Sequence, residues 1–235
     1  DSVVTVDLAA DADSARSLEV VRSSSDLQLD PAYLPKAESR TFAGVDGREI
    51  HAFVYPPTSP DAVAPEGERP PFIVHVHGGP TSHSIPGLNL EHAYFTSRGI
   101  GVIDVNYGGS SGYGRAYRNR LRGQWGVVDV ADCVSAARFL SDEGRADPQR
   151  LVIRGRSAGG FTTLCALTFA RAFAVGASHY GVADLAALAK DTHKFESRYL
   201  DRLIGPYPGR QDVYRERSPI YFTDRLSCPL ILFQG

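Results

Sequence analysis

GRSAGG, at residues 155–160, joins two segments of different pattern, and this junction indicates the type of fold. Before it, RLVIRG (150–155) is a short apolar run that ends in glycine, which is typical of a buried strand. After it, AGGFTTLCALTF (158–169) has the length and composition of a helix. We therefore expect Ser157 to lie on a tight turn between a strand and a helix.

Four further apolar runs of the same kind surround this turn in the sequence. They are FIVHVH (72–77), GIGVIDV (99–105), AVGASHYG (174–181) and PLILFQG (229–235). Helical spacing lies between the second run and RLVIRG, where apolar residues recur at i, i+3, i+4 and i+7 from Val130. Strands that alternate with helices predict an α/β domain with a mostly parallel sheet. Enzyme sites in such sheets gather at the carboxyl ends of the strands.

The first 55 residues have a different pattern, with β-type runs and no helical spacing. Runs at 3–8 and 18–21 predict one hairpin, and residues 41–55 predict a second hairpin that turns at Asp46-Gly47. The chain does not begin with Met, and its first residues already resemble a strand. We interpret the chain as a piece of a longer protein.

The composition excludes several classes of function. Lys+Arg 25 against Asp+Glu 27 gives a net charge of -2, so we expect no nucleic-acid partner and no binding to an anionic membrane. No apolar run approaches the roughly 20 residues of a membrane span. Three cysteines (Cys133, Cys165 and Cys228) lie in apolar neighbourhoods, which favours buried free thiols in a reducing cytoplasm.

Ser157 is the candidate nucleophile. Gly155 and Gly159 flank it in the pattern Gly-x-Ser-x-Gly, and the strand–serine–helix context is that of a nucleophile elbow in an α/β-hydrolase fold. The glycines are needed because side chains beside such a strained turn would collide with the neighbouring strand and helix. A glycine-rich turn without chemistry is the structural alternative.

Two glycine-rich loops follow neighbouring strands and could stabilise an oxyanion. In HVHGGP (75–80), bare backbone at Gly78 and Gly79 could present an N–H group, and in NYGGSSGYG (106–114) the phenol of Tyr113 could donate. His75 and His77 share a strand face and could form a metal pair. No third ligand follows at useful spacing, so we predict no metal site and no cofactor.

A base and an acid are also required for a serine nucleophile. In the α/β-hydrolase order both follow the serine in the chain. His179 comes one strand too early and His193 lies in a polar segment, so we interpret both as structural. We expect the acid and the base outside this chain, after the strand PLILFQG.

These motifs resemble the prolyl oligopeptidase family of serine peptidases, in its acylaminoacyl-peptidase-like (dipeptidyl-aminopeptidase) branch. HGGP, NYGGSSGYG, WGVVDVADC, DPQRLVIRGRSAGG, THKFESRYLD and SPIYFTDRLSCPLILFQG resemble that branch in order and spacing. The resemblance covers residues 39–235 and implies a catalytic α/β-hydrolase domain there, without its C-terminal part. Residues 1–38 would then be the last strands of an N-terminal β-propeller and a linker.

The resemblance also implies roles for single residues. Ser157 matches the nucleophile, and the Ala158 N–H matches one oxyanion donor. The second donor is either the phenol of Tyr113, seven residues after Asn106, or the N–H of Gly79. Arg156 departs from the branch, which often has glycine there.

The function implied is a serine peptidase that acts on short peptides or N-terminal (acyl)aminoacyl bonds when the missing segments complete it. Two alternatives stay open. The first is a carboxylesterase on the same fold, because an elbow and an oxyanion loop also serve esters. The second is an inactive fragment that acts as a structural or binding module.

Overall fold

The computed structural model describes residues 2–7, 18–23, 28–226 and 228–234 and divides the chain into two compact units, residues 1–31 and 32–235. In the first unit, β1 (Ser2–Val6) and β2 (Leu18–Ser23) pair antiparallel, which confirms the first predicted hairpin. Its turn and Leu8 lie outside the described residues. All side chains of both strands are exposed, so the hairpin has no core of its own. That residues 1–38 end a propeller stays a prediction.

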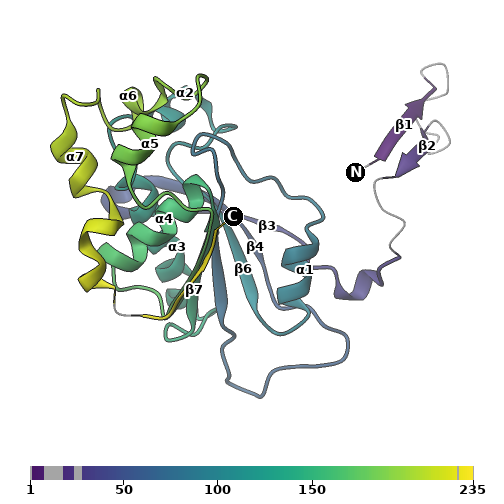
Figure 1. The fold of residues 1–235 in the computed structure, drawn as a ribbon. Coiled ribbons are helices and arrows are strands. Elements are labelled where there is room, and N and C mark those ends of the chain that lie inside the picture. The colour runs from purple at the N-terminus through teal and green to yellow at the C-terminus, as the bar shows by residue number, and fades with distance from the viewer. Residues whose placement is uncertain (1, 8–17, 24–27, 227, 235) are drawn as a thin grey trace. The chain divides into compact units, whose positions relative to one another are not determined.

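A seven-stranded sheet forms the centre of the second unit, in the order β3-β4-β6-β5-β7-β8-β9 (Figure 1). The five strands from β6 to β9 in this order run parallel, whereas β3 and β4 are antiparallel to their neighbours. The predicted α/β fold with a mostly parallel sheet is therefore confirmed. The strands are β3 (Glu38–Ala43), β4 (Glu49–Tyr55), β5 (Phe72–Val76), β6 (Gly101–Asn106), β7 (Leu151–Arg156), β8 (Val175–His179) and β9 (Leu230–Phe233).

Helices cover both faces of the sheet. The two long helices α3 (Val128–Asp142) and α4 (Ala158–Phe169) pack on one face, and α1 (Leu90–Thr96) lies on the other (Figure 1). Successive strand residues point to opposite faces, so Ile103 and Val105 of β6 enter the main core while Asp104 between them points away from it. The sheet thus carries the main apolar core on the α3–α4 face, and a smaller apolar cluster together with polar side chains beneath α1.

The remaining helical segments are short. They are α2 (Gly114–Asn119), α5 (Leu185–Asp191), α6 (Tyr199–Leu203), α7 (Gln211–Glu216) and the 3-10 turns η2 (Pro31–Tyr33), η3 (Val45–Gly47) and η4 (Pro219–Arg225). Within the described residues, no helix has the length and apolar character that crossing a membrane requires. Cys133, Cys165 and Cys228 are all unpaired, as predicted, but only Cys133 and Cys165 are buried, whereas Cys228 is partly exposed.

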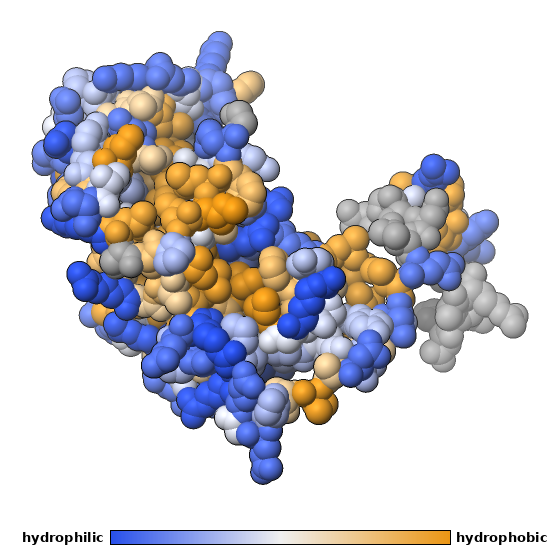
Figure 2. Space-filling model, turned by 60° about the horizontal axis from the view of Figure 1, so that its bottom comes forward, coloured by the Kyte–Doolittle hydropathy of each residue, from blue (hydrophilic) through white to orange (hydrophobic). Residues whose placement is uncertain are grey.

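β9 is the outermost strand on its side of the sheet and is poorly covered. Ile231, Leu232 and Phe233 are 51%, 63% and 43% exposed. A broad hydrophobic area also occupies the middle of the face seen in Figure 2. Exposed apolar strand edges favour association with other chains.

Candidate active site

Ser157 lies at the junction between β7 and α4, where the sequence predicted an elbow. Its backbone angles are φ 54 and ψ -118, a conformation that L-residues avoid and that costs on the order of 1–3 kcal/mol. Two main-chain hydrogen bonds hold it: Ser157 N–H donates to the oxygen of His179 at 2.9 Å, and Phe161 N–H donates to the oxygen of Ser157 at 3.0 Å. The strained turn leaves the serine exposed.

Two glycines make the elbow sterically possible. A Cβ on Gly155 would lie 2.3 Å from the main-chain oxygen of Gly159. A Cβ on Gly159 would lie 2.1 Å from the main-chain oxygen of Val76, in the neighbouring strand β5. Since both obstacles are backbone atoms, they cannot move aside as a flexible side chain could. The close approach of α4 to β5 and β7 therefore requires glycine at both positions.

A small pocket of about 60 Å³ opens beside Ser157. Its walls include Gly79 and Ala158 as well as apolar side chains from α5, α6 and the loops before α3 and α5. The full lining is Gly79, Pro80, Trp125, Ser157, Ala158, Val182, Leu188, Thr192, Glu196, Tyr199 and Leu200. A larger cavity of about 730 Å³ lies at the amino ends of the strands, far from the elbow, and its lining includes neither Ser157 nor Gly79.

Two main-chain N–H groups are available at this pocket. Ala158 is the first residue of α4, so its N–H has no acceptor within the helix. The N–H of Gly79 has no hydrogen-bond partner among the residues that the structure describes. The glycine loop lies close to the nucleophile, because a Cβ on Gly78 would be 3.7 Å from the Cβ of Ser157. The pocket thus has two main-chain N–H groups beside Ser157 without acceptors among the described residues.

Tyr113, the other candidate donor, lies in a different environment. Its hydroxyl accepts a hydrogen bond from Asn106 Nδ2 at 2.9 Å, and its ring stacks on His51 with 4.2 Å between the centroids. Tyr113 is not among the residues that line the Ser157 pocket. The structure thus brings together Ser157, Ala158 and Gly79, and leaves Tyr113 outside this group.

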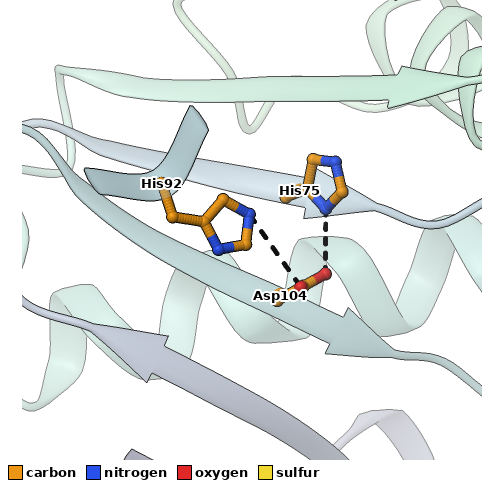
Figure 3. A group of neighbouring side chains, drawn as sticks. All are labelled: His75, His92 and Asp104. Atoms are coloured by element: carbon orange, nitrogen blue, oxygen red, sulfur yellow. Dashed lines mark hydrogen bonds and ion pairs between the residues drawn. The ribbon is translucent and has the colours of Figure 1, made fainter. Parts of the chain in front are cut away.

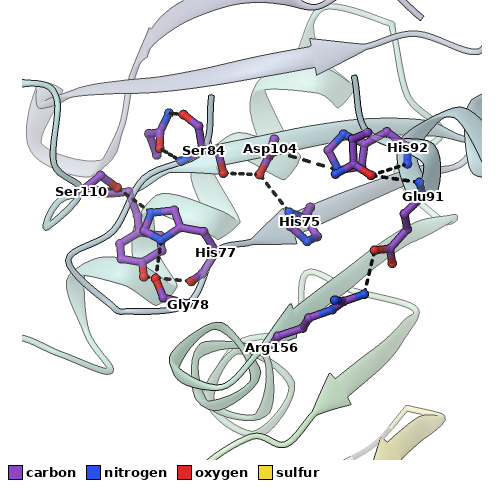
Figure 4. A network of polar contacts seen from close by, with 12 residues as sticks. His75, His77, Gly78, Ser84, Glu91, His92, Asp104, Ser110 and Arg156 are labelled. Carbon is purple, nitrogen blue, oxygen red and sulfur yellow. Dashed lines mark hydrogen bonds and ion pairs between the residues drawn. The ribbon is translucent and has the colours of Figure 1, made fainter. Parts of the chain in front are cut away.

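A buried network supports the glycine loop (Figure 4). His77 Nδ1 lies 2.7 Å from the oxygen of Gly78, and His77 Nε2 lies 2.7 Å from Ser110 Oγ. Tyr107 stacks on the His77 ring and donates to its main-chain oxygen at 3.1 Å. Burial lowers the pKa of His77 to about 4, so the imidazole is neutral near pH 7. His77 is engaged here, so it does not pair with His75 as a metal site.

Arg156, next to the nucleophile, is held by an ion pair. Its guanidinium lies 2.9 Å from Glu91 Oε2, and Arg154 contacts the other oxygen of the same carboxylate. Glu91 is in the first turn of α1, so this helix is fastened to the strand that precedes Ser157. The Arg156 side chain is 53% exposed, so the ion pair remains accessible to water.

Neither described histidine downstream of Ser157 is placed to act as a base. The His179 ring stacks on Phe233 at 4.4 Å and is buried. His193 is 64% exposed and lies 3.6 Å from Glu196.

Buried carboxylates that the sequence did not single out as functional fasten the scaffold. Asp129 accepts hydrogen bonds from Thr162 Oγ1 at 2.5 Å and from Gly126 N–H at 2.7 Å, which joins α3 to α4. Burial raises the pKa of Asp129 to about 6. Asp132 accepts from Gly108 N–H at 2.7 Å and so anchors the loop after β6.

Comparison with known proteins adds independent information. The family model described as "Prolyl oligopeptidase family" matches residues 86–235. Dipeptidyl peptidase family member 6 of Caenorhabditis elegans is 32% identical over an alignment of 218 positions, and the match covers 83% of this chain and 29% of that protein.

Solved structures agree with that match. A puromycin-hydrolyzing peptidase from Mycobacterium tuberculosis is 54% identical with a TM-score of 0.95. The match covers 100% of this chain and 36% of the chain of that peptidase. An acylaminoacyl peptidase from Pyrococcus horikoshii is 28% identical with a TM-score of 0.74. The match covers 85% of this chain and 31% of the chain of that peptidase. The chain spans less than a third of the length of the curated relatives that it matches.

Proposed function

The chain belongs to the prolyl oligopeptidase family, and from this premise we propose that it carries the nucleophile of a serine peptidase. Ser157 attacks the carbonyl carbon of a peptide or aminoacyl amide and forms an acyl-enzyme, which water then hydrolyses. The observation that carries this proposal is the strained, exposed position of Ser157 at the start of α4.

The oxyanion of the tetrahedral intermediate is bound by the N–H groups of Ala158 and Gly79. Both belong to residues of the Ser157 pocket, and both lack a partner among the described residues. The amino end of α4 adds its dipole, which favours negative charge at this place. Donors of this kind are held in position before the reaction and so lower the barrier without reorganisation.

The base and the acid come from outside this chain. The environments of His179 and His193 support this assignment, since one ring is stacked against Phe233 and the other is exposed beside Glu196. Residues 1–38 then belong to the end of an N-terminal propeller that limits access to short substrates. Three unpaired thiols support a reducing compartment such as the cytoplasm.

The substrate class is short peptides or other small amides with an N-terminal amino acid. The relatives' names support it, because they describe a dipeptidyl peptidase, an acylaminoacyl peptidase and a puromycin-hydrolyzing peptidase. Puromycin is itself an aminoacyl amide, so it is a suitable first substrate beside an aminoacyl-4-nitroanilide.

A fluorophosphonate probe tests the proposal on the full-length protein. We expect one covalent adduct, located on Ser157 by peptide mass spectrometry, and hydrolysis of the nitroanilide that the probe abolishes. A 4-nitrophenyl ester tests the carboxylesterase alternative, which predicts ester turnover without amide turnover. An adduct on another serine would remove Ser157 from the mechanism.

A further inference from the structure

His75, His92 and Asp104 form a compact cluster beneath α1 (Figure 3). One ligand atom from each of the three residues lies within 4.8 Å of the other two. His75 and Asp104 are opposite each other in the register of β5 and β6, and His92 reaches down from α1. Three separate elements thus supply two imidazoles and a carboxylate to one place.

The ring nitrogens of His92 are unpaired although the side chain is buried. His92 is 2% exposed, and neither Nδ1 nor Nε2 has a hydrogen-bond partner among the described residues. Nε2 lies 3.9 Å from Asp104 Oδ2, which is too far for a hydrogen bond. Leaving a buried polar group without a partner costs about 1–3 kcal/mol, so native structures rarely do so. His92 Nε2, which faces Asp104, is therefore free to coordinate an ion.

The distances suit a small transition-metal ion. His75 Nδ1 lies 2.9 Å from Asp104 Oδ1, and His92 Nε2 lies 3.9 Å from the other oxygen, Asp104 Oδ2. In a tetrahedral zinc site with bonds of about 2.0–2.1 Å, ligand atoms lie roughly 3.3 Å apart. The two observed separations bracket this value, and every pair of ligand atoms lies within 4.8 Å, so small rearrangements of the three side chains could bring them onto one ion.

Neighbouring groups hold the carboxylate in place. Ser84 Oγ donates to Asp104 Oδ1 at 2.6 Å, and Ser84 is fixed in turn by two hydrogen bonds with the side chain of Asn106 (Figure 4). Outer contacts of this kind orient metal ligands and raise affinity. The nearby guanidinium of Arg154 is paired with Glu91, so its charge is already balanced.

His75 is the most exposed of the three side chains. The side chain of His75 is 19% exposed, whereas those of His92 and Asp104 are 3% and 7% exposed. An ion could therefore enter past His75 and keep a water molecule as its fourth ligand.

We propose that His75, His92 and Asp104 bind one divalent transition-metal ion, with zinc as the ion tested first. Two imidazoles favour such ions over magnesium or calcium, which prefer oxygen ligands. The ion joins α1 to β5 and β6. Because α1 also carries Glu91, it would secure the helix that holds Arg154 and Arg156 beside the nucleophile. The proposal of a metal site does not rest on the proposed peptidase activity.

The test measures zinc binding by the full-length protein after treatment with a chelator. Wild type should bind one zinc ion per chain at this site, measured by elemental analysis and by competition with a chromophoric chelator. His75→Gln and His92→Gln should each weaken that binding by about 10²-fold or more, and Ser84→Ala by about 10–100-fold. His193→Gln is the matched control, because it removes an exposed histidine outside the cluster.

Crystals soaked in zinc chloride locate the ion independently of affinity. Anomalous scattering at the zinc edge should give a peak between the three side chains in wild type and none there in His92→Gln. Equal zinc binding by wild type and both cluster variants, or anomalous peaks only at exposed histidines, would overturn the proposal. Magnesium at the same concentration should not displace the zinc.

Discussion

The main-chain N–H of Ser157 donates to the main-chain oxygen of His179, 2.9 Å away. This bond extends the parallel pairing of β7 and β8 by one residue, up to the strained turn itself. The backbone of His179 therefore stabilises the turn, while the His179 ring packs against Phe233. The elbow is therefore supported on the β8 side by the sheet and on the β5 side by the close approach of Gly159 to Val76.

The first prediction concerns Ser157 itself. In the full-length enzyme, Ser157→Ala should lower kcat by about 10⁶-fold on an aminoacyl-4-nitroanilide, because the substitution removes the attacking hydroxyl. KM should change little, since the hydroxyl contributes to the transition state more than to ground-state binding. Steady-state kinetics of the purified variant provide the measurement, and residual turnover near the wild-type rate would refute the assignment.

The second prediction concerns the glycine requirement at the elbow. Gly159→Ala places a methyl group 2.1 Å from the oxygen of Val76, so it should destabilise the domain by the upper end of roughly 1–3 kcal/mol and abolish labelling of Ser157 by a fluorophosphonate. Urea unfolding measures the first effect.

Gly87→Ala is the matched control for the Gly159 substitution. A Cβ on Gly87 has no atom within 4 Å, and this residue lies on an exposed loop. Its stability should stay within about 0.5 kcal/mol of wild type, with normal labelling. If both variants behaved alike, close packing of α4 against β5 would not be what constrains the elbow.

Local signals explain how much of this fold the sequence could predict. The helix 158–169 is predicted with the bounds that α4 has, because a glycine-rich turn and an apolar helix adjoin in the sequence. The five apolar runs are all strands, because burial on two faces leaves a continuous hydrophobic signal. β9 differs from the other four strands in its burial: its composition is equally apolar, but its side chains are largely exposed.

Contacts between distant segments explain what the sequence could not predict. Asp104 was visible as a charge inside the apolar run GVIDV, yet only the register of β5 with β6 and the docking of α1 bring it to His75 and His92. The choice between Tyr113 and Gly79 depended likewise on how two glycine loops fold. Neither loop conformation follows from spacing alone.

The third prediction follows from the place of Tyr113. Because its hydroxyl accepts from Asn106 and does not line the pocket, Tyr113→Phe should leave kcat within about threefold of wild type. Loss of one hydrogen bond should cost about 0.5–1.5 kcal/mol of stability. A fall in kcat of about 10²–10³ without a change in KM would instead identify the phenol as an oxyanion donor.

The fourth prediction uses the buried carboxyl of Asp129. Its pKa of about 6 lies above the ordinary value of 3.8, so between these values the folded state holds a proton that the unfolded state has lost. The stabilising contribution of this group is present below about pH 4 and is lost as the pH rises through 6. Replacement by asparagine removes this dependence.

The stability of Asp129→Asn relative to wild type should therefore rise between pH 4 and pH 7, by at most about 3 kcal/mol. Only the change with pH is informative, because the amide also alters the hydrogen bonds to Thr162 and Gly126 at every pH. Urea unfolding at several pH values measures it, with the exposed Asp142→Asn of the same helix as the control. A difference that is independent of pH would contradict the raised pKa.

The last prediction is that residues 1–235 by themselves have no significant peptidase activity, although they include Ser157. Without a base, the serine hydroxyl stays protonated and is a poor nucleophile. The two donors at Ala158 and Gly79 could leave only a residual acceleration of about 10³–10⁴ over water. The exposed side chains of β9 should also make this piece aggregate. Expression of residues 1–235 beside the full-length protein, with aminoacyl-4-nitroanilide hydrolysis and light scattering, tests both statements. Turnover within about tenfold of the full-length enzyme would assign the base to His179 or His193.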